Sequence, residues 1–452
     1  MQIPHCKRRR SFFSFSQLAI FFAALLGAIS TARSAPDYRF DFGSDATRPG
    51  FQKITSQTTY DSKQGYGFLS SGNEGSSNAP AGTNVSGNSN AVSFFAVDVP
   101  EGNYDVTLSF GGGTNATSTT VKAESRRLML ERVQTPPGVT STQSFSVNVR
   151  RPAISTGGEV KLNGREKGPP MVPDWDDHLT FEFNGTNPSV TSMVIAPASS
   201  AITVYLAGDS TVTDQAKEPW SSWGQMLPRF FGPGVAVADH AESGEALFTF
   251  QSQRRLDKII STMKRGDYLF IQFGHNDQKD KSPGAGPFTT YTENLKRFIA
   301  AAREKGGIPV LVTPMERRRW VGDQFQPTLA DYAEAVRRVG ISEKVPVIDL
   351  NAMSIRFYMA LGPENSTKAF VHYPENTFPG QDKPLKDDTH HNVYGGYELA
   401  RCVVEGIRAD LPDLAKHLRG DTGSFSPSSP DDPSKFNIPP SPFTVTEKPA
   451  GN

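Results

Sequence analysis

The sequence is short of cysteine, of net charge and of long apolar runs, and each shortage excludes something. Its 452 residues include two cysteines, Cys6 and Cys402; because Cys6 lies in the amino-terminal segment, the rest of the chain cannot form an internal disulfide bond. Lysine plus arginine and aspartate plus glutamate both number 47, so no basic excess indicates a nucleic-acid partner. Beyond the amino-terminal segment, no run is long and apolar enough to cross a bilayer.

Residues 1–35 have the three parts of a secretory signal peptide. A basic run at 7–10 precedes a mostly apolar run at 12–29, and small residues then offer a cleavage site. The alternative is an uncleaved membrane anchor, because the apolar run approaches the roughly 20 residues that span a bilayer. Polar residues within it, such as Ser14 and Gln17, favour cleavage. We therefore expect a secreted, cell-surface or periplasmic protein that no membrane holds after cleavage.

The region 36–198 has the pattern of an all-β domain. Short runs rich in β-branched and aromatic residues alternate with clusters of glycine, serine and asparagine. The runs are residues 38–42, 92–97, 104–110 and 179–183, and the longest cluster is 70–90. The pattern predicts an antiparallel sandwich, and in outline it resembles the jelly-roll, carbohydrate-binding-like modules that accompany carbohydrate-active enzymes. Because the region contains no catalytic constellation, we expect hydrolysis of a small ester to survive its removal.

The region 199–415 has the pattern of an α/β domain. The predicted strands are residues 202–207, 235–238, 268–273, 308–313 and 345–350, and the predicted helices are 247–263, 291–304, 329–341 and 393–409. Such alternation predicts a parallel sheet with helices on both faces and an active site at the carboxyl ends of the strands. The remaining residues, 420–452, are rich in proline and serine and are predicted to form a disordered tail.

Polar residues that suit acyl transfer stand at the predicted strand ends. Ser210 follows the first strand, where a serine beside a helix terminus can act as a nucleophile. Gly244 follows the second strand, and Asn276 follows the third, where its amide can donate to developing negative charge. Asp387 stands three residues before His390 in a predicted loop, a spacing that lets the carboxylate orient the imidazole. Each residue alone has a plain structural alternative, such as a helix N-cap or a turn.

Taken in order, these motifs resemble the signature blocks of the SGNH/GDSL hydrolases. Over residues 200–412 the resemblance is closest to the rhamnogalacturonan acetylesterase branch. It is carried by Gly208-Asp-Ser-Thr-Val212, Trp223-Gly-Gln225, His240-Ala-Glu-Ser-Gly244, Gln272-Phe-Gly-His-Asn-Asp277 and Thr313-Pro-Met-Glu-Arg-Arg318. The resemblance implies a flavodoxin-like α/β/α sandwich, which agrees with the predicted alternation of strands and helices.

The resemblance also implies residue roles and a substrate. Ser210 is expected to be the nucleophile, His390 the general base and Asp387 its orienting partner. The backbone N–H groups of Ser210 and Gly244 and the Asn276 side chain are expected to form the oxyanion hole. No metal or organic cofactor is implied. The expected partner is an acetylated pectic polysaccharide such as rhamnogalacturonan, hydrolysed by a monomeric carboxylic ester hydrolase.

Several alternatives stay open at this point. Asp388 and His391 duplicate the residue types of the triad, so the register could be shifted by one. The same acidic and histidine run could ligate a metal, although no second cluster supplies further ligands. Val212 stands where a Gly-x-Ser-x-Gly elbow needs its second glycine, which excludes an α/β-hydrolase lipase. Two further interpretations remain. One is a GDSL esterase that acts on acetylated xylan or lipid esters, and the other is a non-catalytic carbohydrate-binding protein.

A basic segment follows the fourth predicted strand of the α/β region. Arg317, Arg318 and Arg319 stand beside Trp320 at the edge of the sheet where the triad is expected. Guanidinium groups bind carboxylates bidentately, and an indole stacks on a sugar ring, so the segment is predicted to bind an acidic polysaccharide. The alternative is a solvated basic loop paired with neighbouring carboxylates.

Overall fold

A computed structural model describes Met1 and residues 37–43, 46–69, 92–167 and 174–451. The predicted signal peptide and the Gly/Ser/Asn cluster at 70–90 lie outside the described residues. Within the described ranges, no helix has the length and apolar character needed to cross a membrane.

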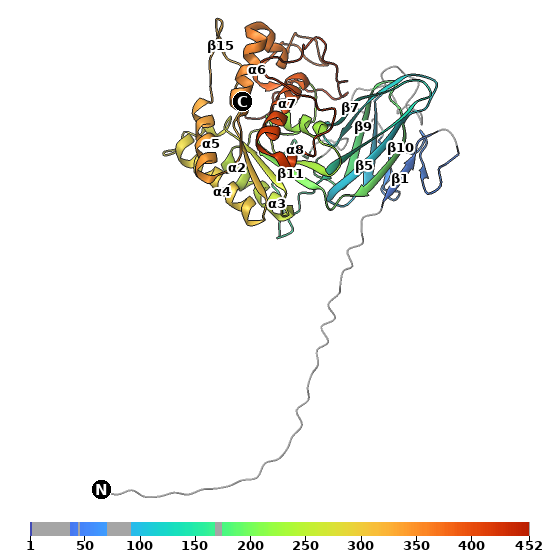
Figure 1. Cartoon of the computed structure of the whole chain (residues 1–452), viewed down its shortest axis with the longest axis horizontal. Helices are drawn as coiled ribbons and strands as arrows, with labels where there is room; N and C mark the ends of the chain where they lie inside the picture. Colours follow the sequence, from blue (N-terminus) through green and yellow to red (C-terminus); the bar gives the residue numbers. More distant parts are fainter. Residues whose placement is uncertain (2–36, 44–45, 70–91, 168–173, 452) are drawn as a thin grey trace. The chain divides into compact units, whose positions relative to one another are not determined.

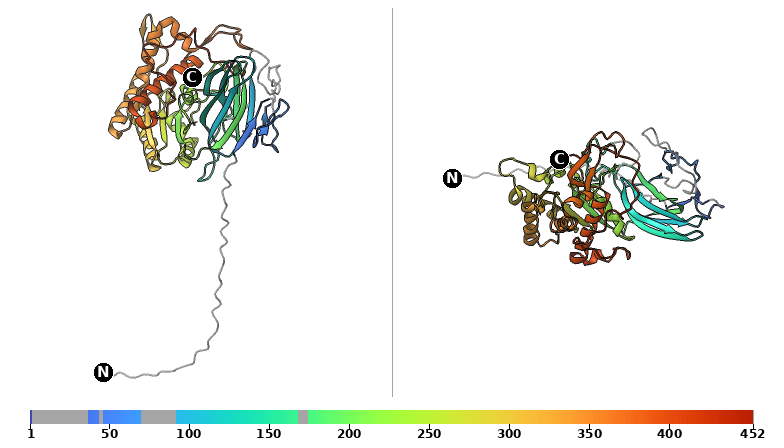
Figure 2. Two further views of the ribbon diagram at one scale, coloured as in Figure 1. Left: turned by 45° about the vertical axis from the view of Figure 1, so that its right-hand side comes forward. Right: turned by 90° about the horizontal axis from the view of Figure 1, so that it is seen from above.

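The first part of the chain forms a sandwich of two five-stranded sheets (Figures 1 and 2). One sheet has the order β2 (Gln52–Lys53), β1 (Tyr38–Asp41), β10 (Val190–Pro197), β5 (Gly102–Gly111) and β8 (Thr140–Val149). The other has the order β3 (Tyr66–Phe68), β4 (Ser93–Asp98), β9 (His178–Thr186), β6 (Thr117–Ala123) and β7 (Arg127–Thr135). All neighbours are antiparallel except β1 and β2, and inward aromatic and aliphatic side chains such as Phe95 and Phe145 fill the core.

The second part is built on a five-stranded parallel sheet. Its order is β12 (Val235–Asp239), β11 (Ile202–Gly208), β13 (Tyr268–Gln272), β14 (Ile308–Val312) and β17 (Val347–Ile348). In chain order this is 2-1-3-4-5, the flavodoxin-like arrangement, whose switch point lies beside β11. The predicted fold class, a flavodoxin-like α/β/α sandwich preceded by a β-sandwich, is confirmed.

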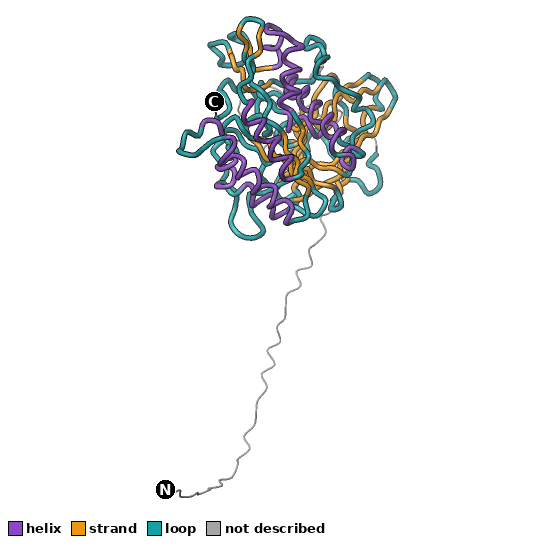
Figure 3. The backbone as a smooth tube through the Cα atoms, turned by 60° about the vertical axis from the view of Figure 1, so that its left-hand side comes forward, coloured by secondary structure: helices purple, strands orange, loops and turns teal. Residues whose placement is uncertain are grey.

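Helices cover both faces of the parallel sheet (Figure 3). They are α1 (Trp223–Met226), α2 (Leu247–Ser252), α3 (Arg255–Thr262), α4 (Thr292–Glu304), α5 (Ala330–Glu343), α6 (Leu350–Asn365), α7 (Val393–Asp410) and α8 (Pro412–Ala415). Side chains of β11 alternate between the faces. Val204 and Leu206 lie in one core with residues of α1, α6 and α7, whereas Tyr205 and Ala207 lie in another with residues of α2, α3, α4 and α5.

Two predicted elements differ from the structure. The single helix predicted at 247–263 is divided into α2 and α3, because Arg254 takes a left-handed conformation with a φ of 64°. The strand predicted at 345–350 is shorter, because the Asp349 side chain accepts a hydrogen bond from the Ala352 N–H and starts α6 at Leu350. Two hairpins, β15 (Trp320–Val321) with β16 (Gln324–Phe325) and β18 (Phe370–Tyr373) with β19 (Leu385–His391), complete this part.

The tail also differs from its prediction. Instead of being disordered, residues 420–451 run in extended and turn conformations against the rest of the protein (Figure 1, dark red). The Tyr394 hydroxyl donates to the Asp431 carbonyl at 2.7 Å, and the Lys122 ammonium donates to the Pro439 carbonyl at 2.9 Å. The tail builds no core of its own. Its backbone carbonyls instead find donors on both folded parts, which a sequence pattern cannot reveal.

Candidate active site

Three residues that the sequence analysis singled out meet at the carboxyl end of β11. The Ser210 Oγ lies 2.8 Å from His390 Nε2, and His390 Nδ1 lies 2.8 Å from Asp387 Oδ2. Ser210 and His390 are 180 positions apart in the sequence. The Asp387 Oδ1 accepts the backbone N–H groups of Thr389 and His390 at 2.8 and 3.0 Å, which fixes the carboxylate. This is the geometry of a nucleophile, a base and an orienting acid.

A bulge in β19 positions the acid and the base together. Asp387 and His390 were expected in a loop, but both lie in this strand. Phe370 of β18 pairs with His391, and the adjacent Val371 pairs with Asp387, so the three residues between them are extra to the ladder. The bulge bends the strand locally, and the imidazole of His390 lies against the carboxylate three residues before it.

The structure places the neighbouring Asp388 and His391 elsewhere. The His391 Nε2 lies 2.9 Å from the Tyr358 hydroxyl, and burial together with the nearby charge of His390 lowers the pKa of His391 to about 3. Asp388 is half exposed, and Arg318 and His372 each lie 2.9 Å from its Oδ1. Neither residue contacts Ser210, so the geometry favours the register with Asp387 and His390.

The environment keeps Asp387 ionised. Burial on its own would raise the pKa of this carboxyl group, but the hydrogen bond and charge of His390 and the two backbone N–H donors outweigh it. The pKa of Asp387 therefore lies well below its usual range. A permanently charged carboxylate at this position stabilises an imidazolium at His390, which is the state that proton abstraction from Ser210 creates.

The expected oxyanion donors lie on the two neighbouring loops. Gly244 has a φ of 88°, a conformation that glycine adopts readily. The Asn276 Nδ2 donates to the Glu245 carbonyl at 3.0 Å, which ties the second loop to the third and leaves one amide hydrogen available. Within the described part of the chain, the N–H groups of Ser210 and Gly244 donate to no other protein group. No protein acceptor therefore competes with an oxyanion for these two N–H groups.

The sandwich supports the loop of Ser210, which the sequence analysis missed. Arg126, in the turn between β6 and β7, is 2% exposed and donates to the carbonyls of Gln215 and Trp220, both at 2.9 Å. The Gln215 side chain in turn donates to the Ser210 carbonyl at 2.9 Å. Arg126 also pairs with Glu218 at 2.5 Å. The sequence signal available was the charged stretch Glu124-Ser-Arg-Arg127, which directly precedes the apolar residues 128–130.

The basic segment after β14 divides into three different environments. The Arg317 Nη2 donates to the His275 carbonyl at 3.2 Å, directly before Asn276. The Arg318 guanidinium donates hydrogen bonds to the Asp388 carboxylate and to the Ser366 hydroxyl. Arg319 is exposed, and among the described residues its side chain has no hydrogen-bond or ion-pair partner. The Trp320 ring packs edge-on against Phe325 with centroids 5.3 Å apart.

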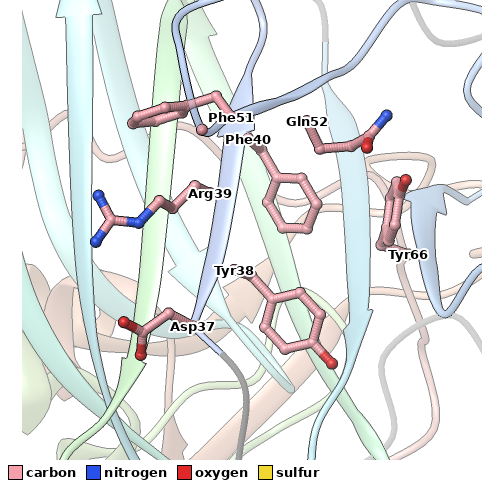
Figure 4. Close-up of a pocket in the computed structure, with 8 residues that line it drawn as sticks. Asp37, Tyr38, Arg39, Phe40, Phe51, Gln52 and Tyr66 are labelled. Carbon is pink, nitrogen blue, oxygen red and sulfur yellow. The ribbon is translucent and has the colours of Figure 1, made fainter.

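A hollow of about 450 Å³ lies on the sandwich rather than at the triad (Figure 4). Its lining is Asp37, Tyr38, Arg39, Phe40, Gly50, Phe51, Gln52 and Tyr66. Figure 4 shows Tyr38 and Phe40 on one side of β1 and Arg39 on the other, so its polar groups do not converge. No three His, Cys, Asp or Glu side chains in the described ranges are grouped so that they could hold a metal ion.

Comparison with known proteins identifies related sequences for both parts of the chain. The profile of the GDSL-like Lipase/Acylhydrolase family matches residues 206–392. A second profile, "Beta-agarase/YXIM esterase-like, galactose-binding domain-like", matches residues 38–151. The first match contains Ser210, Gly244, Asn276, Asp387 and His390, and the second falls on the sandwich.

Three proteins of Bacillus subtilis (strain 168) illustrate the relationship. Rhamnogalacturonan acetylesterase RhgT is 40% identical over 220 residues, which are 48% of this chain and 94% of RhgT. Probable rhamnogalacturonan acetylesterase YesY is 34% identical over 208 residues, 45% of this chain and 92% of YesY. Uncharacterized esterase YxiM is 26% identical over 400 residues, 84% of this chain and 94% of YxiM.

The fold and these matches define a carboxylic ester hydrolase, as the sequence predicted. The chain belongs to the GDSL-like lipase/acylhydrolase family, in its rhamnogalacturonan acetylesterase-like branch.

Proposed function

We propose that this protein removes O-acetyl groups from an acetylated pectic polysaccharide, rhamnogalacturonan or a close relative of it. The observation that carries the proposal is the Ser210–His390–Asp387 hydrogen-bonded chain at the carboxyl end of β11. The substrate class is supported by the 40% identity to RhgT, a protein named as a rhamnogalacturonan acetylesterase.

The proposed reaction is a two-step acyl transfer. His390 takes the proton of Ser210 while the Oγ attacks the acetyl carbonyl carbon. The bond to the sugar oxygen then breaks, and that oxygen receives the proton from His390. Water attacks the acetyl-enzyme, His390 takes a proton from this water, and acetate leaves as Ser210 is regenerated. Asp387 stays ionised throughout and holds the imidazole in its reactive tautomer.

The oxyanion of each tetrahedral intermediate is assigned to three donors. They are the backbone N–H groups of Ser210 and Gly244 and the side-chain amide of Asn276. Each donor that is already in place when charge develops lowers the barrier by about 3 kcal/mol. The environment of His391 supports the assignment of the base to His390. Burial lowers the pKa of His391, and its imidazole lies beside the Tyr358 hydroxyl instead of Ser210, so His391 cannot take the proton of Ser210.

A panel of acetylated polymers tests the substrate class. We expect acetate release from acetylated rhamnogalacturonan to exceed release from acetylated xylan by about tenfold or more, a difference of about 1.4 kcal/mol in transition-state binding. Acetate is quantified at equal acetyl content, with Ser210→Ala as the blank for non-enzymatic release. A preference for xylan acetate, or equal rates on both polymers, would contradict the pectic assignment.

Charge reversal at Arg319 tests how an acidic polymer is held. Arg319 is exposed and stands two residues after Arg317 in the basic segment. Arg319→Glu should therefore raise KM for acetylated rhamnogalacturonan by about threefold to tenfold. Added salt should reduce the effect, and KM for 4-nitrophenyl acetate, which is uncharged, should stay unchanged. Arg265→Glu is the matched control, because this exposed arginine precedes β13 at the opposite edge of the sheet. Equal effects of the two reversals would remove Arg319 from the substrate path.

The proposal includes the division of the chain into a signal peptide and two domains. Residues 1–35 are proposed to direct export, 36–198 to form the sandwich module and 199–415 to form the hydrolase domain. Export suits an enzyme whose substrate is a polysaccharide too large to enter a cell. The protein is proposed to act as a monomer.

A further inference from the structure

The described part of the tail reaches the candidate active site. Its segment 439–445 is fastened to the loop that precedes α1. The Glu218 N–H donates to the Phe443 carbonyl, and the Val445 N–H donates to the Glu218 carbonyl, both at 2.8 Å. The Trp220 indole N–H donates to the Val445 carbonyl at 3.2 Å. The ring of this tryptophan lies edge-on to the His390 imidazole with centroids 5.7 Å apart, so the fastened segment ends beside the base.

The next residues of the tail continue across the triad. The Lys448 ammonium lies 3.7 Å from Asp387 Oδ2, the oxygen that also faces His390. Pro449 is buried, although the two residues before it are exposed. The tail therefore turns from the surface into the protein at the position of the acid and the base.

The last described residues fill the space over the oxyanion donors. A Cβ built on Gly244 would lie 3.4 Å from the Ala450 Cβ and 3.6 Å from its carbonyl carbon. A Cβ built on Gly451 would lie 2.6 Å from Asn276 Oδ1 and 2.8 Å from Gly244 Cα. Ala450 and Gly451 thus lie next to Gly244 and Asn276, the residues that carry two of the three groups assigned to the hole. Ser210 is 3% exposed in this arrangement.

We propose that residues 446–451 form an inhibitory strap that competes with the substrate for the active site. The inference rests on the proposed role of Ser210, Gly244 and Asn276. The acetyl carbonyl must approach these groups, and in the structure the tail occupies the space beside them. A substrate is bound only when the strap has left, so the strap raises KM and leaves kcat unchanged.

The two parts of the tail suit such a movement. The segment 439–445 makes several buried hydrogen bonds, including that of the Ser441 N–H to Glu218 Oε1 at 3.0 Å, and it stays in place as an anchor. The only ion pair of the strap among the described residues is Lys448 with Asp387. The ammonium is half exposed, and such a pair contributes little to holding the strap. The hinge is therefore placed at Thr446 and Glu447, directly after the anchor.

A single added methyl group at Gly451 is expected to displace the strap from the active site. Gly451 has a φ of 100°, which an L-residue rarely adopts, and a methyl group there would collide with Asn276 and Gly244. Gly451→Ala should unseat the strap and lower KM for 4-nitrophenyl acetate by about threefold to tenfold at unchanged kcat. Removal of residues 446–452 should lower KM at least as far. Gly420→Ala is the matched control, since nothing lies within 4 Å of its added methyl group; it should change neither constant.

Two further measurements separate the strap from the identity of the nucleophile. A fluorophosphonate, which loses fluoride as a serine Oγ bonds to its phosphorus, should label Ser210 about threefold to tenfold faster in Gly451→Ala than in Gly420→Ala. A synthetic peptide of residues 446–452 should inhibit the shortened enzyme competitively. Equal labelling rates and equal KM values in all variants would overturn the strap, and a higher KM after removal of 446–452 would make it part of the substrate site. Absence of labelling in every variant would instead overturn the role of Ser210.

Discussion

Ser210→Ala is expected to reduce kcat/KM for 4-nitrophenyl acetate by about four to six orders of magnitude. The variant keeps the fold, because the lost hydroxyl has His390 as its hydrogen-bond partner and the backbone of residue 210 is held by Gln215. It loses the atom that attacks the carbonyl. The measurement is initial rates at several substrate concentrations, with Ser252→Ala as a matched serine control on the exposed surface of α2.

Combining Ser210→Ala with His390→Ala should add little further loss, because the base has no function once its nucleophile is absent. The adjacent carboxylates supply a second comparison. Asp387→Asn should lower kcat by about 10⁴, whereas Asp388→Asn, which affects a half-exposed carboxylate paired with Arg318 and His372, should be nearly neutral. Retention of more than a tenth of the activity by Ser210→Ala, or reversal of the order of the two aspartates, would contradict the assigned triad.

The residues that bring chemistry to the strand ends could be predicted from the sequence. β11 and β13 are covered on both faces, so they appear as nearly continuous apolar runs, and the polar residues that follow them stand out. Ser210 and Asn276 are therefore placed at one edge of the sheet by local pattern alone. The pairing of Asp387 with His390 needed the resemblance as well, because the pattern alone left a register shifted by one open.

The strand that carries the acid and the base could not be predicted. Its residues Lys386, Asp387, Asp388 and Thr389 are polar, and β19 exists because it pairs with β18 and bulges against it. The prediction that the tail is disordered was wrong for a related reason. Its composition cannot build a core, but composition does not record that Lys122 and Glu218 offer partners to Pro439, Ser441 and Phe443. Contacts between residues far apart in the sequence decided both cases.

The role of the sandwich is the other feature that local pattern hides. The sequence analysis expected activity on small esters to survive removal of residues 36–198, because that region contains no catalytic constellation. The structure changes this expectation. Gln225 donates to the carbonyls of both Ser125 and Gln215, and Arg127, the first residue of β7, donates to Asp214 Oδ2 at 2.6 Å. The turn between β6 and β7 and the start of β7 therefore support the nucleophile loop.

Arg126→Ala is therefore expected to be among the most damaging substitutions outside the triad. It removes the guanidinium donor from the carbonyls of Gln215 and Trp220 and leaves the buried Glu218 carboxylate without its cation. The Gln215 carbonyl keeps Gln225 as a donor, and Glu218 keeps the Ser441 N–H. Breaking a buried ion pair in this way lowers the free energy of unfolding by about 3–5 kcal/mol. Because the two carbonyls belong to the loops beside Ser210 and His390, a small displacement should also reduce kcat by about 10- to 100-fold.

The measurements are urea unfolding and kcat for 4-nitrophenyl acetate at a temperature where the variant remains folded. Arg132→Ala is the matched control: this arginine is in β7 of the same sheet, its side chain is 41% exposed, and its partner Glu131 lies 3.6 Å away. It should change stability by less than about 1 kcal/mol and leave kcat unchanged. Arg126→Lys should recover part of the stability through Glu218, yet it cannot donate to both carbonyls in the same geometry, so kcat should stay low. If Arg126→Ala kept full kcat once folded, the turn would support the stability of the domain but not the position of the nucleophile.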